Sequence, residues 1–248
     1  TGIPGLRAQF MIAKLLWLQR QQPRAWRQAA RLCLISDFLS LLFTGQHVSE
    51  AGAAGLTALV DIRDCRWWPK MCRSVGLEVG WLPAVVRAGT DLGELRPQVA
   101  QRLGLPRRCR FIVGCLDQYA AAISADNVSP GATSESTGTV LATISCADRM
   151  SDDLRPEVFQ GPAFAVDRFY RMAFGDVSAG YLEWYRNTLP DRPDFDTLAA
   201  LAQPIEPGAE GLRLDPNAPR ATVEHVFRGW TPRHTPGHAV RCILEAVA

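Results

Sequence analysis

An aspartate and a glutamine stand side by side just after a compact apolar run, where they could act on a hydroxyl group. Residues 110–115 (R-F-I-V-G-C) predict a buried strand, and residues 118–125 predict an Ala-rich helix. Ligands of open α/β sheets bind beyond the carboxyl ends of the strands, so Asp117 is a candidate general base. Gln118 can both donate and accept hydrogen bonds, which suits a polyol hydroxyl. The alternative is that Asp117 only caps the following helix.

A second candidate is the segment S-E-S-T-G-T at residues 134–139. A glycine flanked by hydroxyl side chains before a strand can present backbone N–H groups to a phosphate, which makes Gly138 a candidate contact. The alternative is an ordinary β-hairpin turn, because Ser, Thr and Gly are common in such turns.

Two further groups of side chains carry weaker signals. Basic residues gather before the apolar run and could hold an acidic partner, although a solvated loop is the plainer interpretation; they are Arg102, Arg107, Arg108 and Arg110. Aromatic residues that could stack on a sugar are Trp67, Trp68, Tyr181, Trp184 and Tyr185. Aromatic residues at helical spacing more often form core.

The elements that must position these residues follow from apolar periodicity and from Gly and Pro. The expected helices are 6–20, a segment from about residue 23, 37–43, 67–75, 97–103, 177–187, 195–202 and the residues after Pro236. Ser36 is the expected N-cap of the third helix, and Gly45 its C-terminal stop. The run 31–35 fits either a short strand or the tail of the second helix.

The remaining segments predict strands and loops. A strand is expected at residues 139–145, after a turn at residues 134–138, and residues 147–175 alternate strand-like pieces with turns. Residues 46–66 are small and Gly-rich, which suggests loops or close backbone packing. This mixture indicates an α/β protein, with the best domain boundary near residues 127–131.

The composition limits the class of protein. At about 150 residues per domain, 248 residues indicate one to two domains. The hydrophobic fraction of 47% excludes disorder over most of the chain. No apolar run approaches the roughly 18 residues of a membrane span. A net charge of +2 is too small to argue for nucleic acid or an anionic membrane surface, so we expect neither partner.

Cysteine and histidine spacing predicts no metal site. The seven cysteines are scattered and form no C-x-x-C pair, which favours a reducing compartment, so we expect a cytoplasmic protein. His234 and His238 have helical i, i+4 spacing, but Pro236 and Gly237 interrupt the segment. No Cys or carboxylate at a suitable spacing completes a site, so two histidines at a helix entry are the plainer interpretation.

The two ends predict that the sequence is an internal piece of a longer reading frame. Residue 1 is Thr and opens directly into helical periodicity, while residues 239–248 look like a helix cut short. A processed mature protein is the alternative. No charged segment followed by an apolar one marks a signal peptide.

An ordered set of motifs along nearly the whole chain resembles the FGGY family of carbohydrate kinases. In chain order, the motifs are Lys14-Leu15-Leu16-Trp17-Leu18 with Gln21, Asp37-Phe38-Leu39 with Leu42-Phe43-Thr44-Gly45, Gly76-Leu77, Leu82-Pro83, Gly89, Gly93, Gly104-Leu105, Gly114-Cys115-Leu116-Asp117-Gln118, Gly138-Thr139, Phe227-Arg228-Gly229-Trp230 and Arg241-Cys242-Ile243-Leu244-Glu245. The segment that ends in Asp117-Gln118 resembles the family's G-x-x-D segment with its catalytic aspartate. Gly138-Thr139 resembles the G-T loop that opens the second domain.

The resemblance implies an α/β, actin-like and ribonuclease-H-like ATPase fold with two domains, both incomplete. Residues 1–128 would be the C-terminal portion of the sugar-binding domain, and residues 129–248 the N-terminal portion of the nucleotide-binding domain. The family moves the γ-phosphoryl group of ATP to a sugar or polyol hydroxyl with the help of Mg²⁺. Asp117 would accept the hydroxyl proton, Gln118 would help to hold the substrate, and Gly138 and Thr139 would meet the ATP phosphates. A homodimer is a further expectation.

Departures from the family pattern keep other classes open. The N-terminal D-x-G-T phosphate loop and the C-terminal glycine-rich adenosine segment do not occur in residues 1–248. Ser124 and Asp126 stand where glycines are expected, and Met11 replaces a small residue. We therefore expect the parent protein to be a kinase and this piece alone to be inactive. A non-catalytic sugar-binding or regulatory relative is the alternative, and an actin-like ATPase with water as acceptor is a third.

Overall fold

The computed structural model of the chain describes residues 1–5, 8, 10–138, 140–152, 157–175 and 177–247. It divides into two compact units, each described below by itself. Unit 1 comprises Thr1–Ser134 and Ile144–Ala173, and unit 2 comprises Glu135–Thr143 and Phe174–Ala248. The domain boundary expected between residues 128 and 129 stays a prediction.

Unit 1 opens with short helices around an apolar core. Its α-helices are α1 (Met11–Gln21), α2 (Pro23–Gln28), α3 (Ile35–Thr44), α4 (Ala51–Gly55), α5 (Pro69–Ser74), α6 (Pro97–Leu103) and α7 (Asp117–Ser124), with a 3-10 turn at Val79–Trp81. Pro opens α2, α5 and α6, where its missing N–H costs nothing. Leu15 of α1 packs with Leu59 and Leu77 in the core of this part of the unit.

Short strand pairs connect these helices. The strands are β1 (Val48–Glu50), β2 (Val60–Asp61), β3 (Arg66–Trp67), β4 (Ala84–Val86), β5 (Asp91–Glu94) and β6 (Arg110–Ile112). β1 and β4 are parallel, with Glu50 opposite Val86, whereas β2 pairs with β3 and β5 with β6 in antiparallel fashion. Glu50, at the carboxyl end of β1, is the N-cap of α4.

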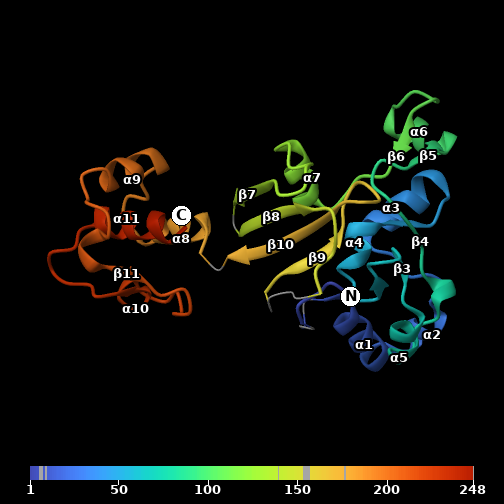
Figure 1. Cartoon of the computed structure of the whole chain (residues 1–248), viewed down its shortest axis with the longest axis horizontal. Coiled ribbons are helices and arrows are strands. Elements are labelled where there is room, and N and C mark those ends of the chain that lie inside the picture. The colour runs from blue at the N-terminus through green and yellow to red at the C-terminus, as the bar shows by residue number, and fades with distance from the viewer. Residues whose placement is uncertain (6–7, 9, 139, 153–156, 176, 248) are drawn as a thin grey trace. The chain divides into compact units, whose positions relative to one another are not determined.

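A four-stranded sheet lies beside α7 (Figure 1). Its strands are β7 (Thr133–Thr137), β8 (Leu141–Ala147), β9 (Phe159–Pro162) and β10 (Phe169–Gly175), in the order β7-β8-β10-β9. Tyr119 and Ala122 of α7 pack against Ile144 of β8 and Tyr170 of β10 in one buried cluster. This packing fixes α7 on the face of the sheet.

Unit 2 builds its own core from helices and one short strand pair. Its elements are α8 (Ala179–Thr188), α9 (Phe195–Ala202), a 3-10 turn at Ala209–Gly211, β11 (Arg213–Leu214), α10 (Val223–Val226), β12 (Phe227–Arg228) and α11 (Pro236–Val247). Tyr185, Leu198, Phe227 and Ile243 meet in this core. Gly237 lets α11 approach α9 closely, because a Cβ there would lie 2.2 Å from the Leu201 carbonyl oxygen.

The expected helices with clear start and stop signals are confirmed. The predictions for residues 97–103 and 195–202 match α6 and α9, and the helix after Pro236 is α11. Gly45 ends α3 with φ of +88°, as its predicted role as the C-terminal stop requires. The α/β class is also confirmed by the mixture of helices and strands.

Two helix-start predictions are wrong. The first helix begins at Met11 rather than at residue 6, because Phe10 is extended (ψ 151°) and packs against Phe159 in the core; residues 6, 7 and 9 lie outside the described residues. Ser36 is not an N-cap, because α3 already begins at Ile35. The buried Asp37 carboxylate accepts the Leu34 N–H at 2.9 Å and does the capping instead.

The predictions for three extended segments also differ from the structure. Residues 31–34 form neither strand nor helix. β6 is not buried: Ile112 is 52% exposed, because β6 pairs only with β5 in a two-stranded ribbon. Residues 134–138 are not a turn, since Thr133–Thr137 is strand β7 and the turn to β8 follows it.

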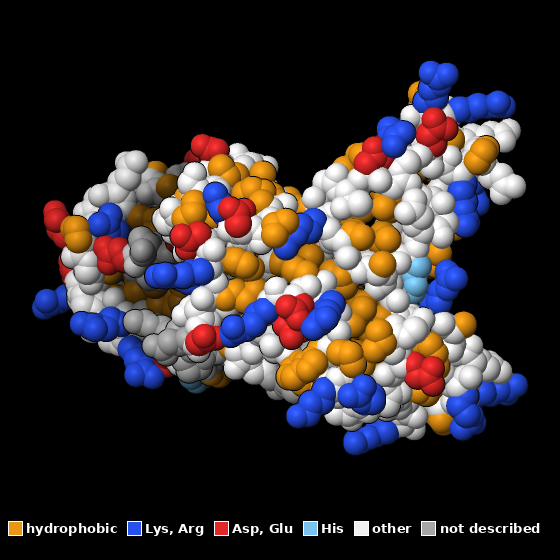
Figure 2. Space-filling view, turned by 45° about the vertical axis from the view of Figure 1, so that its right-hand side comes forward, with side chains coloured by type: hydrophobic (Ala, Val, Ile, Leu, Met, Phe, Trp, Pro, Cys, Tyr) orange, Lys and Arg blue, Asp and Glu red, His pale blue; other side chains and the backbone are white. Residues whose placement is uncertain are grey.

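Several large apolar side chains of α3 are exposed to solvent. Ile35, Phe38, Leu39 and Leu42 are exposed, while Asp37 and Ser40 of the same helix are buried. The hydrophobic side chains visible between charged ones in Figure 2 show that such exposure is common on this face of the molecule.

Candidate functional site

Asp117 is the first residue of α7, and its side chain is exposed. One carboxylate oxygen, Oδ1, accepts the Gln118 N–H at 2.7 Å. A carboxylate in the first turn is favoured by the helix dipole, because the N–H groups there carry partial positive charge. The alternative that Asp117 is the N-cap is wrong, because Leu116 holds the N-cap position and no side chain caps α7 there. The contact with Gln118 uses one oxygen and leaves an exposed carboxylate that a substrate can reach.

Gln118 offers an unused acceptor beside this carboxylate. Its Oε1 is buried, and among the described residues it has no hydrogen-bond partner. Buried polar atoms in proteins are normally hydrogen-bonded, so this oxygen is available to an external donor. A hydroxyl group that donates to this oxygen would satisfy it.

Glu50 is the buried N-cap of α4. Its carboxylate is 6% exposed and accepts the N–H groups of Gly52 at 2.8 Å and Ala53 at 2.9 Å. Burial raises the pKa of Glu50, and these hydrogen bonds and the Arg87 charge oppose the rise.

Tyr119 fixes the other side of the first turn of α7. It is 3% exposed, and its ring lies 4.8 Å from that of Tyr170, whose hydroxyl donates to the Asn127 carbonyl at 2.7 Å. Gly52 makes room for the ring, because a Cβ at residue 52 would lie 2.8 Å from a Tyr119 ring carbon. The close backbone packing expected from the small residues of 46–66 is confirmed here.

The thiol next to this turn is held in its neutral form. Burial raises the pKa of Cys115, and the carboxylates of Glu50 and Asp117 raise it further. Cys115 therefore does not present a thiolate nucleophile beside Asp117.

Sequence reasoning missed Glu50. Its only signal was an acidic residue before the run A-G-A-A-G at residues 51–55. Short side chains are the usual N-caps, so a glutamate at that position is a weak indication of a cap.

The second predicted site lies in unit 2. Gly138 lies between β7 and β8, where its N–H donates to the Val140 carbonyl at 3.3 Å. The turn alternative does not hold for residues 134–137, which belong to strand β7. Thr139 lies outside the described residues. The structure thus brings Asp117 and Gln118 together in unit 1, and leaves their relation to Gly138 a prediction.

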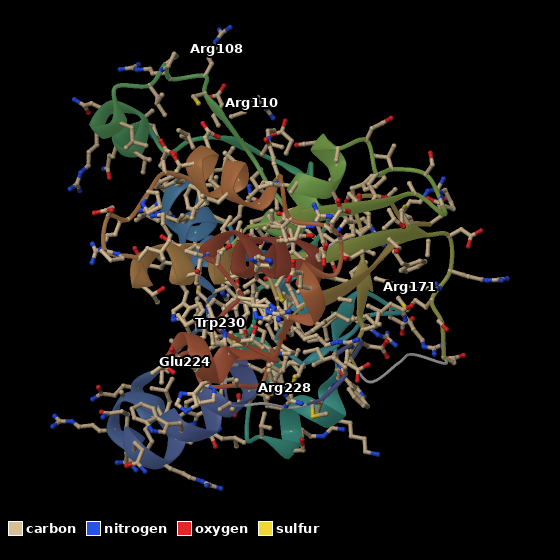
Figure 3. The ribbon with its side chains drawn as sticks, turned by 90° about the vertical axis from the view of Figure 1, so that its left-hand side faces the viewer. Arg108, Arg110, Arg171, Glu224, Arg228 and Trp230 are labelled. Atoms are coloured by element: carbon tan, nitrogen blue, oxygen red, sulfur yellow. The ribbon has the colours of Figure 1, made fainter. Side chains whose placement is uncertain are left out.

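The weaker candidates have plain structural roles. Arg110 pairs with Asp91 at 2.7 Å, and Figure 3 shows Arg108 and Arg110 on the same outlying part of unit 1. The aromatic candidates Trp67, Tyr181 and Tyr185 are buried, which confirms that they form core. They therefore present no open ring face to a sugar.

Trp17 belongs to the Lys14–Leu18 motif, and it is an exposed aromatic residue that sequence reasoning did not propose as a sugar contact. It is 57% exposed and lines an open apolar hollow of about 490 Å³ with Ala8, Ala13, Lys14 and Leu18. The exposed fraction is large for tryptophan, so the ring face is available for contact with a partner or a ligand.

His234 and His238, both in unit 2, make matching contacts with a threonine three residues earlier. Nδ1 of His234 accepts the Thr231 N–H at 2.9 Å, and Nδ1 of His238 accepts the Thr235 N–H at 3.1 Å. Their rings lie 5.3 Å apart, and His238 Nε2 lies 3.6 Å from Glu210. The described parts of the chain contain no group of three or more His, Cys, Asp or Glu side chains that could hold a metal ion.

Comparison with protein families identifies the class. Residues 1–124 match the model of the FGGY family of carbohydrate kinases, N-terminal domain. The chain belongs to this family, as the motif resemblance predicts.

Individual relatives agree with this membership. The chain is 28% identical to a xylulose kinase of Bacillus subtilis over 247 residues, which is 96% of this chain and 49% of that protein. It is 29% identical to an L-fuculokinase of Salmonella typhi over 239 residues, 94% of this chain and 50% of that protein. The chain thus spans about half the length of the curated relatives it matches.

Solved structures show the fold. A ligand-bound xylulose kinase from Lactobacillus acidophilus matches with a TM-score of 0.86 and 20% identity, over 97% of this chain and 50% of that chain. A gluconate kinase from the same organism matches with a TM-score of 0.86 and 20% identity, over 99% of this chain and 51% of that chain. The fold is therefore that of the actin-like sugar kinases, of which this chain covers half. No helix in the described ranges is long and apolar enough to cross a membrane.

Proposed function

We propose that the protein carrying this chain transfers the γ-phosphoryl group of ATP to a hydroxyl of a sugar or polyol, with Asp117 as general base. The observation that carries the proposal is the pairing, at the start of α7, of an exposed carboxylate with the buried Oε1 of Gln118, which has no hydrogen-bond partner among the described residues. The carboxylate accepts the proton of the attacking hydroxyl, and the amide oxygen accepts a hydrogen bond from another hydroxyl. The kinases among the relatives support this chemistry.

ATP and Mg²⁺ are the proposed cofactors. Mg²⁺ neutralises charge on the transferring phosphates when it is bound with ATP. Gly138 and Thr139 are the proposed phosphate contacts. A Cβ at Gly138 would meet no atom within 4 Å, so the backbone there is open to a close approach. Because Mg²⁺ is usually held by phosphates and one or two carboxylates, we propose that the ion binds the nucleotide phosphates rather than a site made only of protein ligands.

The proposed location is the cytoplasm, because all seven cysteines are free thiols. The proposed partner is a small sugar or polyol. A homodimer remains a prediction. Size-exclusion chromatography with light scattering would test it by measuring the molar mass of the full-length protein.

A non-catalytic sugar-binding relative is the second candidate, motivated by Ser124 and Asp126. Asp126 adopts φ of +58°, the left-handed conformation that a glycine would take most easily. Aspartate tolerates this conformation better than most residues, and Ser124 ends α7 without interrupting it. The two departures therefore preserve the backbone that presents Asp117. This favours the kinase over the non-catalytic relative.

A sugar panel tests the proposal. The full-length protein would be mixed with ATP, Mg²⁺ and, in turn, xylulose, fuculose, gluconate or glycerol, and ADP release would be measured. Sugar-dependent ADP release with a phosphorylated product is expected. Sugar binding by calorimetry without turnover would support the binding relative, and full ADP release without sugar would support an ATPase.

A further inference from the structure

The charges of the chain are unevenly distributed along the sequence. Residues 1–36 contain six Lys and Arg residues and no Asp or Glu, whereas all 25 acidic residues lie in residues 37–248 together with 21 basic ones. The small net charge of +2 therefore conceals a strongly basic first segment. A local excess of one sign attracts an oppositely charged partner even when the whole molecule is nearly neutral.

The described cations of this segment are exposed on α1, on α2 and just after α2. They are Lys14, Arg20, Arg24, Arg27 and Arg31, and we call them the basic surface. α1 and α2 contact each other, and Leu15 and Trp26 belong to one core (Figure 1). Among the described residues, none of the five cations forms an ion pair. Their charges are therefore free to meet those of a partner.

An apolar hollow adjoins the basic surface. It has a volume of about 490 Å³ and is lined by Ala8, Ala13, Lys14, Trp17 and Leu18, so Lys14 belongs to both features. Trp17 and Leu18 follow Lys14 by three and four residues in α1, which places the three side chains on one face of the helix. Trp and Arg are the residue types most enriched where protein interfaces gain their binding energy.

The helix that carries Trp17 is held firmly from its other face. Ile12 and Leu15 are 4% and 2% exposed, and the Gln19 side-chain amide donates to the Val75 carbonyl. A contact surface that is already ordered loses little conformational entropy when a partner binds.

We propose that the basic surface and the hollow beside Trp17 form a docking site for an acidic polypeptide segment of another protein. One apolar side chain of that segment packs on Trp17 in the hollow, and its carboxylates pair with the arginines. Charge complementarity selects the acidic partner, because the surface presents five cations and no acidic residue occurs before Asp37. The site is additional to the proposed function, since neither Asp117 nor Gln118 lines the hollow.

The same residues favour a polypeptide over other polyanions. Proteins that hold single-stranded nucleic acid stack successive bases on several aromatic side chains, whereas α1 exposes one, Trp17, and Trp26 of α2 is half-buried. A helix that lies on a membrane buries a broad apolar face. α2, all of whose residues the structure describes, exposes no large apolar side chain.

Peptide binding to the full-length protein tests the proposal by fluorescence anisotropy. The probe is a labelled short peptide of Glu and Ser with one central Leu, and matched peptides replace every Glu by Gln or the Leu by Ser. We expect the acidic peptide with Leu to bind most tightly. Added salt should weaken its binding, because exposed charges are screened.

Two double variants separate the basic surface from the net charge. Arg24→Gln/Arg27→Gln removes two charges from the basic surface, and Arg107→Gln/Arg108→Gln removes two exposed charges elsewhere in unit 1. Each exposed ion pair changes an affinity by roughly 2- to 5-fold. The first variant should therefore weaken peptide binding by roughly 4- to 25-fold, and the second should leave it unchanged.

Trp17→Ala tests the hollow. Because Trp17 is 57% exposed, the variant should unfold at nearly the wild-type temperature, while its affinity for the acidic peptide with Leu falls on the order of 10-fold or more. Equal affinity of the wild type for the Leu and Ser peptides would overturn the role of the hollow.

Three outcomes would overturn the docking site itself. The first is no binding of the acidic peptide with Leu, or equal losses in the two double variants. The second is tighter binding of oligothymidylate or of phosphatidylserine vesicles through the same arginines, which would replace the polypeptide by that polyanion. The third is self-association in light scattering that Arg24→Gln/Arg27→Gln abolishes, which would assign the surface to a second copy of the protein.

Discussion

Gly52→Ala is expected to destabilise the protein, although alanine is the better helix former. A Cβ at residue 52 would lie 2.8 and 3.0 Å from two ring carbons of Tyr119, and 3.1 Å from Glu50 Oε2. Tyr119 cannot move away cheaply, because it is 3% exposed and packed against Tyr170. Overpacking of this kind costs about 1–3 kcal/mol.

Gly55→Ala, in the same helix, provides a matched control. Its Cβ would meet Ile62 at 3.7 Å and Pro162 at 3.9 Å, which are ordinary van der Waals distances. The change from Gly to Ala inside a helix contributes about 0.5–1 kcal/mol, and both variants share this gain. The stability difference between the two variants therefore isolates the clash with Tyr119, and we expect it to be roughly 1–3 kcal/mol in favour of Gly55→Ala.

Urea unfolding followed by circular dichroism measures both free energies by linear extrapolation. The full-length wild-type protein and both variants would be compared at one pH and one protein concentration. Equal stability of Gly52→Ala and Gly55→Ala would refute the close packing of Tyr119 on α4.

Three further changes test other parts of the description. Leu15→Ala should lower the free energy of unfolding by about 2–5 kcal/mol, because Leu15 is 2% exposed in the core; a loss under about 1 kcal/mol in urea unfolding would place Leu15 outside that core. Burial raises the pKa of Asp37, so the folded state binds the proton more tightly than the unfolded chain. The stability of wild type relative to Asp37→Asn should therefore rise as the pH falls from neutral toward the ordinary Asp pKa, and a pH-independent difference between their unfolding curves would contradict the burial. Asp126→Gly should leave stability unchanged or raise it by up to about 1 kcal/mol, because φ is +58° there; a clear loss in thermal unfolding would show that the Asp126 side chain is needed.

Local signals made part of the fold predictable. Asp194 caps α9 by accepting the Thr197 N–H at 2.8 Å, and Pro97 and Pro236 open α6 and α11. Such interactions join residues within one turn, so the sequence pattern contains them. The stop of α3 at Gly45 was predictable for the same reason, and the predicted start of α7 at Gln118 differs from the observed start at Asp117 by one residue.

Interactions between distant segments were not predictable. The apolar run of β6 is typical of a buried strand, yet burial depends on which strands pair with it, and here only β5 does. The polar β7 resembles a turn in composition, and its strand conformation comes from pairing with β8. Glu50 escaped notice because glutamate is a weak indication of an N-cap, and its burial depends on how the folded chain packs around it.

The most direct test of the central claim is the turnover number of Asp117→Asn in the full-length protein, measured together with its sugar affinity. Asparagine keeps the size of the side chain and removes the base, so kcat should fall by about 10²–10⁴-fold. The dissociation constant of the sugar, measured by calorimetry, should change little. Wild-type turnover in Asp117→Asn would contradict the assignment of Asp117 as the general base.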